Sequence, residues 1–226
     1  MSTPAQRPIS AFVFDAYGTL FDVHAAVRRH AGDLGPEAQR LSAIWREKQL
    51  EYSWTRALMG RYLDFWVLTE QALDTAMSIV GVSDAALRGR LLEAYWKLDC
   101  YQEVPSVLKK LKDGGHRLAI LSNGSPAMLE AAVAAAGIGD LLDEVFSVDM
   151  LKTYKTSQDV YEIVTNHFRI YPEAVSFQSS NRWDIAGATA FGFRSVWINR
   201  TGAADEYADL PPVAVLNDLQ GLLNLA

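Results

Sequence analysis

Short apolar runs, rich in β-branched and aromatic residues, recur along the chain and predict strands. They lie at Ala11–Phe14, Arg117–Leu121, Glu144–Ser147, Ala174–Phe177, Ser195–Ile198 and Val213–Leu216. Helical patterns separate most of these runs, at Val104–Asp113, Pro126–Ala136, Ser157–Phe168 and Asp184–Phe191. Strands that alternate with helices favour right-handed crossovers and a parallel sheet covered on both faces. The pattern therefore predicts an α/β protein with a Rossmann-like core.

One long stretch, residues 23–98, contains no strand pattern and is predicted to be helical. It is rich in aromatic residues: Trp45, Tyr52, Trp54, Tyr62, Phe65, Trp66, Tyr95 and Trp96. We interpret it as a helical cap inserted into a core formed by residues 1–22 and 99–226. Most of these aromatic side chains are expected to pack within the cap. Because the insertion follows the first strand, it should cover the carboxyl end of the sheet, where α/β proteins bind ligands.

Composition and charge exclude several classes of protein. The chain has 226 residues, of which 50% are hydrophobic, so a sizeable core is expected. A net charge of −6 with no basic stripe argues against binding to nucleic acid. No apolar stretch approaches the length of a membrane span, and residues Met1–Ser10 lack the apolar core of a signal peptide. Cys100 is the only cysteine, which precludes an internal disulfide and indicates a cytoplasmic location.

Four polar segments end or follow predicted strands, so they should meet at one edge of the sheet. They are Asp15-Ala16-Tyr17-Gly18-Thr19, Leu121-Ser122-Asn123-Gly124-Ser125, Lys152-Thr153-Tyr154-Lys155 and Ser179-Ser180-Asn181-Arg182-Trp183-Asp184. Asp15 ends a wholly apolar run, where a carboxylate is costly to desolvate unless it has a function. The second segment opens a helix, and its amide, hydroxyl and backbone N–H groups suit an anion.

These segments resemble, in order, those of the L-2-haloacid dehalogenases in the haloacid dehalogenase superfamily. The matching pieces are Asp15–Thr19, Trp45–Tyr52, Leu121–Gly124, Tyr154-Lys155, Ser179–Asp184 and Trp197–Arg200. Each motif alone is weak, but their order along nearly the whole chain is specific. The resemblance implies hydrolysis of 2-haloalkanoic acids without a cofactor, release of halide, and a homodimer.

A magnesium-dependent phosphatase on the same scaffold is the main alternative. Such an enzyme uses a cluster of oxygen ligands for Mg²⁺ and a second acid to protonate the leaving oxygen. Tyr17 stands where that acid would lie, and Asn181 leaves Asp184 as the only carboxylate of its segment. A halide leaves as a stable anion and needs no proton, so these residues favour carbon–halogen cleavage. A non-catalytic binding module with this fold is a third hypothesis.

In the dehalogenase interpretation, the Asp15 carboxylate attacks the halogen-bearing carbon and forms an ester on the enzyme. The substrate carboxylate repels Asp15 by about 4 kcal/mol at ~4 Å and an effective dielectric of ~20. Ser122 and Asn123 are placed to hold the substrate carboxylate, assisted by backbone N–H groups near Ala16 and Tyr17. Lys155 is the candidate cation beside Asp15, and it would also keep Asp15 ionised. The resemblance assigns the same roles.

The cap is expected to contribute a halide site. Taken alone, Arg46 would be interpreted as a solvated helix residue, but the surrounding motif implies that it receives the departing halide. Leu50, Phe65, Tyr17 and Trp183 would form an apolar wall that excludes water. For each of these four side chains taken alone, plain core packing is the favoured explanation.

Ester hydrolysis is the second half-reaction, and water must attack the carbonyl carbon of the Asp15 ester. Asp184 is the acid best placed to orient or deprotonate that water, with Ser179 and Asn181 assisting. Thr19 is a candidate hydrogen-bond donor to Asp15, although a turn hydroxyl that satisfies backbone explains it equally well. Tyr161 is expected to tether Lys155 or the neighbouring carboxylates and to line the substrate site. Displacement at carbon predicts inversion, from an L-2-halo acid to a D-2-hydroxy acid.

The chain departs from the family pattern in two places. Thr156-Ser157 follows Lys155 where the family has Pro and then Asp or a similar residue. Without a proline, the placement of Lys155 should be less fixed, and Thr156 or Ser157 should cap the next helix. Gln178 stands where an apolar strand residue is usual. No metal site is expected, because the four histidines lack metal-ligand spacing: His24, His30, His116 and His167.

Overall fold

A parallel sheet forms the centre of the protein in the computed structural model, which describes residues 8–225. Within those residues it has six strands: β1 Ala11–Phe14, β2 Arg117–Ser122, β3 Glu144–Ser147, β4 Val175–Ser179, β5 Arg194–Ile198 and β6 Ala214–Leu216. The strand order is β3-β2-β1-β4-β5-β6, and every neighbouring pair is parallel. The prediction of a Rossmann-like α/β core is confirmed. Part of the predicted polar N-terminal segment, residues 1–7, lies outside the described residues.

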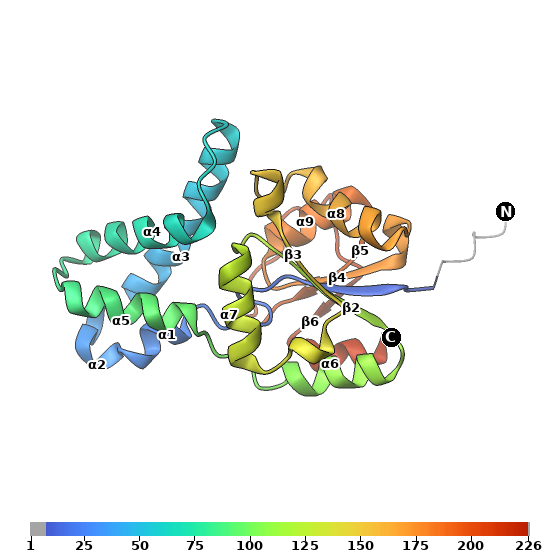
Figure 1. Cartoon of the computed structure of the whole chain (residues 1–226), viewed down its shortest axis with the longest axis horizontal. Helices are drawn as coiled ribbons and strands as arrows, with labels where there is room; N and C mark the ends of the chain where they lie inside the picture. Colours follow the sequence, from blue (N-terminus) through green and yellow to red (C-terminus); the bar gives the residue numbers. More distant parts are fainter. Residues whose placement is uncertain (1–7, 226) are drawn as a thin grey trace.

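Helices cover both faces of this sheet. They are α6 Val104–Asp113, α7 Pro126–Ala136, α8 Gln158–Phe168 and α9 Arg182–Phe191. Helix α6 packs on β2 and α7 on β3, whereas α9 packs on β4 and β5 and against α8. Figure 1 shows α8 and α9 above the sheet and α6 below it. Short 3₁₀ helices complete the core: η2 Gly139–Leu141, η3 Val148–Leu151, η4 Pro172–Ala174 and η5 Leu219–Asn224.

A purely helical unit, here called the cap, separates β1 from α6. It consists of α1 Ala25–Arg29, α2 Ala31–Leu34, η1 Gly35–Glu37, α3 Ala38–Leu58, α4 Phe65–Val80 and α5 Ala85–Trp96. Figure 1 shows it beside the core, on the left, with α3 and α4 packed together. The Asp64 side chain accepts from the N–H groups of Trp66 and Val67 and starts α4, while Gly81, at φ +76°, ends it. No helix within residues 8–225 is long and apolar enough to cross a membrane.

The two crossings between core and cap lie side by side. Phe21 and Cys100 form an isolated antiparallel bridge. Asp22 N–H donates to the Asp99 carbonyl at 3.0 Å, and Tyr101 N–H donates to the Leu20 carbonyl at 2.9 Å. Burial raises the pKa of the Cys100 thiol, which leaves it a poor nucleophile at neutral pH. We call these paired segments, residues 20–22 and 99–101, the hinge.

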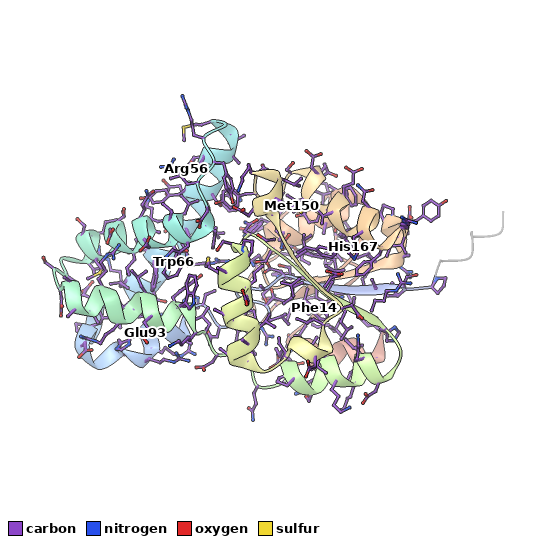
Figure 2. All side chains as sticks on the ribbon, viewed as in Figure 1. Phe14, Arg56, Trp66, Glu93, Met150 and His167 are labelled. Atoms are coloured by element: carbon purple, nitrogen blue, oxygen red, sulfur yellow. The ribbon has the colours of Figure 1, made fainter. Side chains whose placement is uncertain are left out.

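The apolar interior runs without a break from the sheet into the cap. Phe14, inside the core, and Trp66, in the cap, belong to or pack against the same buried cluster (Figure 2). All four residues of β1 are buried, as expected for a central parallel strand covered on both faces. The apolar runs therefore predict the strands well. They fail at the end of β4, which includes the buried Gln178 and extends to Ser179, paired with Trp197 of β5. The Gln178 amide donates to Ser176 Oγ at 2.6 Å.

Gly187 on α9 is a position where even a methyl group should be harmful. A Cβ there would overlap the Tyr161 hydroxyl and the Thr156 side chain. We expect Gly187→Ala to lower the free energy of unfolding by about 1–3 kcal/mol, because overpacking forces the helix away from these groups. Urea denaturation measures this change.

Gly89→Ala on α5 is the matched control, since no atom lies within 4 Å of the Cβ it would add. Replacing a helical glycine there should stabilise the protein by about 1 kcal/mol. An unfolding midpoint for Gly187→Ala equal to that of the native protein would contradict the close packing of α9 on Tyr161.

Candidate active site

Asp15 lies directly after β1, at the carboxyl edge of the sheet where the strand order reverses between β1 and β4. Its backbone N–H donates to the Gln178 carbonyl at 2.8 Å, which extends the pairing with β4 by one residue. The residue is only 5% exposed. A buried carboxylate needs partners for its charge. Its surroundings supply them from three separate segments of the chain.

Three side chains donate to one oxygen of that carboxylate, Asp15 Oδ2. Thr19 Oγ1 lies at 3.0 Å, Asn181 Nδ2 at 2.8 Å and Ser179 Oγ at 3.3 Å. The structure thus brings together the predicted polar groups of the first and fourth segments. This arrangement fixes the plane of the carboxylate before any substrate binds.

Backbone N–H groups orient the two hydroxyls in this set. Ser180 N–H donates to Thr19 Oγ1 at 2.8 Å, and Asn181 N–H donates to Ser179 Oγ at 3.1 Å. Each hydroxyl oxygen therefore accepts from the backbone while its own proton points to Asp15. The two explanations offered for Thr19, a bond to Asp15 and a bond to backbone, both apply.

The other Asp15 oxygen faces a buried cation. Lys155 Nζ lies 3.0 Å from Asp15 Oδ1 and 2.8 Å from Asp184 Oδ2. Tyr161 OH donates to Asp184 Oδ1 at 2.9 Å. The side chains of Lys155 and Asp184 are wholly buried. One ammonium group thus bridges two carboxylates in a buried site, where breaking the pairing would be costly.

The buried charges of Lys155, Asp15 and Asp184 influence one another, and the effect is seen in the pKa values of Lys155 and Asp184. Burial raises the pKa of Asp184 to about 6, against the opposing charge of Lys155. Burial lowers the pKa of Lys155, but its attraction to Asp15 and Asp184 outweighs that effect and raises the pKa overall. Lys155 therefore stays charged at neutral pH. Asp184 changes its protonation state near pH 6, close to where a general base is most useful.

Lys155 is held firmly although no proline follows it. Its backbone N–H donates to Asn123 Oδ1 at 3.0 Å, in addition to the two bonds of its ammonium group. Three hydrogen bonds thus hold Lys155 at a position where the family pattern has a following proline. The Lys155–Thr156 peptide is cis. Ser157 occupies the N-cap of α8, but its side chain makes no capping hydrogen bond.

Tyr161 tethers a neighbouring carboxylate, which is one of the two roles predicted for it. Its ring is wholly buried against Phe177 and Phe193, and its hydroxyl meets Asp184. It therefore tethers a carboxylate from behind rather than tethering Lys155. Burial raises its pKa well above the ordinary value, and the Asp184 charge adds to this rise, so the hydroxyl remains a donor.

The second segment ends β2 and opens α7. Gly124 N–H donates to Ser122 Oγ at 3.1 Å, and both Ser122 and Asn123 are buried. Because Asn123 Oδ1 accepts from Lys155, its NH₂ group is the part left to meet a ligand. Within residues 8–225, no protein group accepts from the backbone N–H of Ala16 or Tyr17. These donors have the character expected for an anion site.

Arg46 reaches from the cap into this site. Its Nη2 donates to the Tyr17 carbonyl and to Asn181 Oδ1, both at 3.3 Å. Tyr17 stacks on Tyr95 of α5, with centroids 5.8 Å apart and rings inclined by 10°. Burial raises the pKa of Tyr95, opposed by the nearby Arg46 charge. A cation from α3 therefore stands over the residues that surround Asp15, as predicted for a halide acceptor.

The predicted apolar wall divides into two parts. The ring centroids of Phe65 and Tyr17 lie 6.3 Å apart. Trp183 instead packs edge-on against Trp54, with ring centroids 5.2 Å apart. Leu50 is half-buried on α3. A cavity of about 690 Å³ adjoins the second part; its walls include Trp54, Trp183 and Lys155 but not Asp15.

The sequence interpretation missed Trp54 and Tyr95 as neighbours of the site. A signal for Trp54 exists, since Arg46, Leu50 and Trp54 recur every four residues and share one face of α3. No comparable signal marks Tyr95, because its position depends on how α5 packs against the core.

These donors do not fit a resident metal ion. Within the described chain no group of three His, Cys, Asp or Glu residues is arranged to hold one. Lys155 Nζ, moreover, occupies the space between Asp15 and Asp184 that a cation would take. The lysine supplies the positive charge that a metal provides in other carboxylate sites.

Comparison with known proteins identifies close relatives. A model of the haloacid dehalogenase-like hydrolases matches residues 9–192. The chain is 48% identical to (S)-2-haloacid dehalogenase 1 of Pseudomonas sp. (strain CBS-3), covering 96% of both chains. It is 46% identical to (S)-2-haloacid dehalogenase 4A of Burkholderia cepacia, covering 95% of this chain and 93% of the relative.

A solved structure from Xanthobacter autotrophicus is also similar. It is an L-2-haloacid dehalogenase with chloropropionic acid covalently bound. It superimposes with a TM-score of 0.86 at 35% identity and covers 96% of this chain and 98% of that one.

Removing the bridging charge should destabilise the protein in a pH-dependent manner. We expect Lys155→Met to lower the free energy of unfolding by about 3–5 kcal/mol at pH 8, because two buried carboxylates then face each other unpaired. Loss of Lys155 raises the pKa of Asp184 further above the ordinary 3.8, so the native state binds a proton more readily than the unfolded chain. Stability should therefore return as the pH falls through that pKa, as measured by denaturant unfolding from pH 8 to pH 5.

Lys109→Met is the control, since Lys109 forms an exposed ion pair with Asp113 on α6. It should change the free energy of unfolding by no more than about 0.5 kcal/mol at either pH. If both variants behave alike, the buried bridge does not carry the stability assigned to it.

Proposed function

The chain belongs to the (S)-2-haloacid dehalogenases of the haloacid dehalogenase-like hydrolase family, and we propose that it converts short L-2-haloalkanoic acids to D-2-hydroxy acids through an ester of Asp15. The observation that carries this proposal is the Asp15–Lys155–Asp184 chain, in which a lysine bridges the two carboxylates. It supplies an ionised nucleophile, a fixed cation and a separate base in one buried site.

The first step is displacement at carbon. An Asp15 oxygen attacks the carbon that bears the halogen, a carbon–oxygen bond forms, and the halide leaves with the bonding electron pair. Lys155 and the N-terminal end of α7 offset the repulsion of about 4 kcal/mol between the two carboxylates. The Arg46 guanidinium, which lies 3.3 Å from Asn181 Oδ1, is the acceptor proposed for the halide. Attack from the side opposite the halogen inverts the configuration.

The second step regenerates Asp15. A water molecule adds to the carbonyl carbon of the ester and gives a proton to Asp184, whose pKa of about 6 leaves it ionised at neutral pH. The N–H groups of Ala16 and Tyr17 are the donors proposed for the developing oxyanion. Collapse of this intermediate breaks the bond between the ester carbonyl carbon and the alkoxide oxygen. The leaving alkoxide takes up the proton that Asp184 holds, and the second proton of the water is released to solvent. Asp15 returns to a carboxylate that keeps one oxygen from water.

Tyr17 argues against phosphate as the substrate. It stands where a phosphatase would have its second acid, and its ring is buried against Tyr95. Burial raises the pKa of Tyr17 well above the ordinary value, so the phenol is a weak acid at neutral pH. Departure of an alkoxide from phosphorus would lack the proton it needs, whereas departure of a halide needs none. The phosphatase alternative therefore has little support.

We also propose a cellular location, an oligomeric state and binding partners for the enzyme. The single cysteine supports a cytoplasmic location, and the family resemblance supports a homodimer. Its partners are the haloacid and the released halide, with no nucleic acid and no membrane.

The activity is tested by incubating the purified protein with L-2-chloropropionate in the presence of EDTA. We expect chloride and D-lactate in equal amounts, and none from Asp15→Asn, because the amide is not a nucleophile. Asp159→Asn, an exposed acid on α8, should retain full activity. A single turnover in ¹⁸O-water should place the label in Asp15. Failure to release halide from any short 2-halo acid would overturn the proposal.

The role of Asp184 predicts the pH dependence of the second step. The rate of ester hydrolysis should fall as the pH drops below about 6, where Asp184 takes up a proton. The Tyr161 hydrogen bond lowers the pKa of Asp184, so Tyr161→Phe should move this fall upward by about 1 pH unit. Rapid-quench measurement of the ester across pH 5–9 provides the profile.

Tyr52→Phe is the control, because it removes a tyrosine hydroxyl that bonds Thr75 within the cap. Its profile should coincide with that of the native enzyme. A Tyr161→Phe profile without an upward shift would show that Asp184 is not the group that titrates.

A further inference from the structure

The segment Trp197–Arg200 matches the family yet takes no part in the chemistry described above. It ends β5 and lies at the same edge of the sheet as Asp15. Arg200 Nη2 donates to the Thr19 carbonyl at 2.9 Å, across 181 positions of sequence. Arg200 therefore contacts the turn that follows the proposed nucleophile without contacting Asp15 itself.

The same guanidinium group also holds the returning half of the hinge. Its Nη2 lies 2.6 Å from Glu103 Oε1, and its central carbon stands 3.7 Å from the centroid of the Tyr101 ring. Tyr101 in turn donates its N–H to the Leu20 carbonyl. The side chains of Arg200 and Glu103 are 14% and 11% exposed. Arg200 thus joins the turn after Asp15 to the hinge through Tyr101, and to the start of α6 through a largely buried charge pair with Glu103.

A continuous path of hydrogen bonds runs from Arg200 to the carboxylate. Arg200 fixes the Thr19 carbonyl, and Thr19 Oγ1 donates to Asp15 Oδ2 at 3.0 Å. Ser180 N–H donates to the same hydroxyl, and the Ser180 carbonyl accepts from Trp197 Nε1 at 3.3 Å. The two ends of the segment therefore brace the two turns that present donors to Asp15.

Two arginines hold neighbouring carbonyls of one turn from opposite sides. Arg46, from the cap, donates to the Tyr17 carbonyl, and Arg200, from the core, donates to the Thr19 carbonyl. Arg200 also contacts the hinge, so the orientation of the cap and the position of Asp15 share one anchor. In-line displacement depends on the alignment of the nucleophile with the leaving group, and a shift of about 1 Å can cost about 100-fold in rate.

We propose that Arg200 is a positioning residue that aligns Asp15 with the cap-borne Arg46, acting through Thr19 and the hinge. The proposal rests on the dehalogenase function. Arg200 touches neither substrate nor halide, so its loss should reduce the rate of ester formation and leave substrate affinity nearly unchanged. A purely structural ion pair would instead change stability without this separation between kcat and KM.

The test compares Arg200→Met and Arg200→Lys with the native enzyme on L-2-chloropropionate. Arg200→Met should lower kcat and the rate of ester formation about 10- to 100-fold, with KM within about 3-fold of native. Arg200→Lys should recover part of the rate, since the ammonium group can still reach the Thr19 carbonyl. If Arg200→Met fails to fold, the rates of Arg200→Lys still test the proposal. Arg117→Met, which removes an arginine stacked over Phe168 at the start of β2, is the matched control and should keep the native rate.

A double-mutant cycle with Thr19→Ala distinguishes positioning from a general loss of order. If Arg200 acts through Thr19, the rate loss in the double variant should be smaller than the combined losses of the two single variants, so the effects are not additive. Additive losses, or a native kcat in both Arg200 variants, would overturn the proposal.

Hydrogen exchange provides a measurement that does not need activity. In Arg200→Met, peptides covering residues 15–22 and 99–104 should exchange faster, while those of β3 should not change. Native exchange in both peptides would overturn the bracing role. A native enzyme without dehalogenase activity would refute the proposed function, and the exchange result would still decide whether Arg200 braces the turn and the hinge.

Discussion

The ammonium group of Lys155, buried between two carboxylates, is the interaction on which the site depends. Without it, two buried carboxylates, those of Asp15 and Asp184, would lie close together with no cation between them. The two acids differ in their surroundings: Asp15 is surrounded by hydrogen-bond donors, whereas burial raises the pKa of Asp184 to about 6 against the opposing charge of Lys155. One cation pairs with both the proposed nucleophile and the proposed base. It also takes the place that a metal ion would need.

The topology of the sheet explains why these groups can meet at all. Residues 15, 122, 155 and 184 are far apart in sequence, but each lies at the end of a strand, in the segment before a helix or in the first turn of a helix at the carboxyl edge. The reversal of strand order between β1 and β4 leaves a crevice at that edge. The cap then closes it with Arg46 and Tyr95. The core thus supplies the reacting groups, and the cap supplies the dry surroundings and a second cation.

The strands, the helices and most of the polar set could be predicted because they depend on local patterns. Apolar runs mark buried parallel strands, and polar segments after them converge by topology alone. The setting of Lys155 could not be predicted, because it depends on the Asn123 side chain, which is remote in sequence. Which of its two predicted partners Tyr161 tethers could not be predicted for a similar reason: its contacts are with Asp184 and two phenylalanines that come together only in the fold.

The paired crossings at the hinge make the cap a module that the core can exchange. The chain leaves beside the point where it returns, with Phe21 next to Cys100 and Asp22 bonded to Asp99. A segment whose ends are already joined adds little loop-closure entropy, and that cost grows only slowly with its length. Changes in the cap can therefore alter which molecules reach the site while the core keeps its own closed geometry. The fold in this way separates the evolution of specificity from the evolution of bond-breaking chemistry.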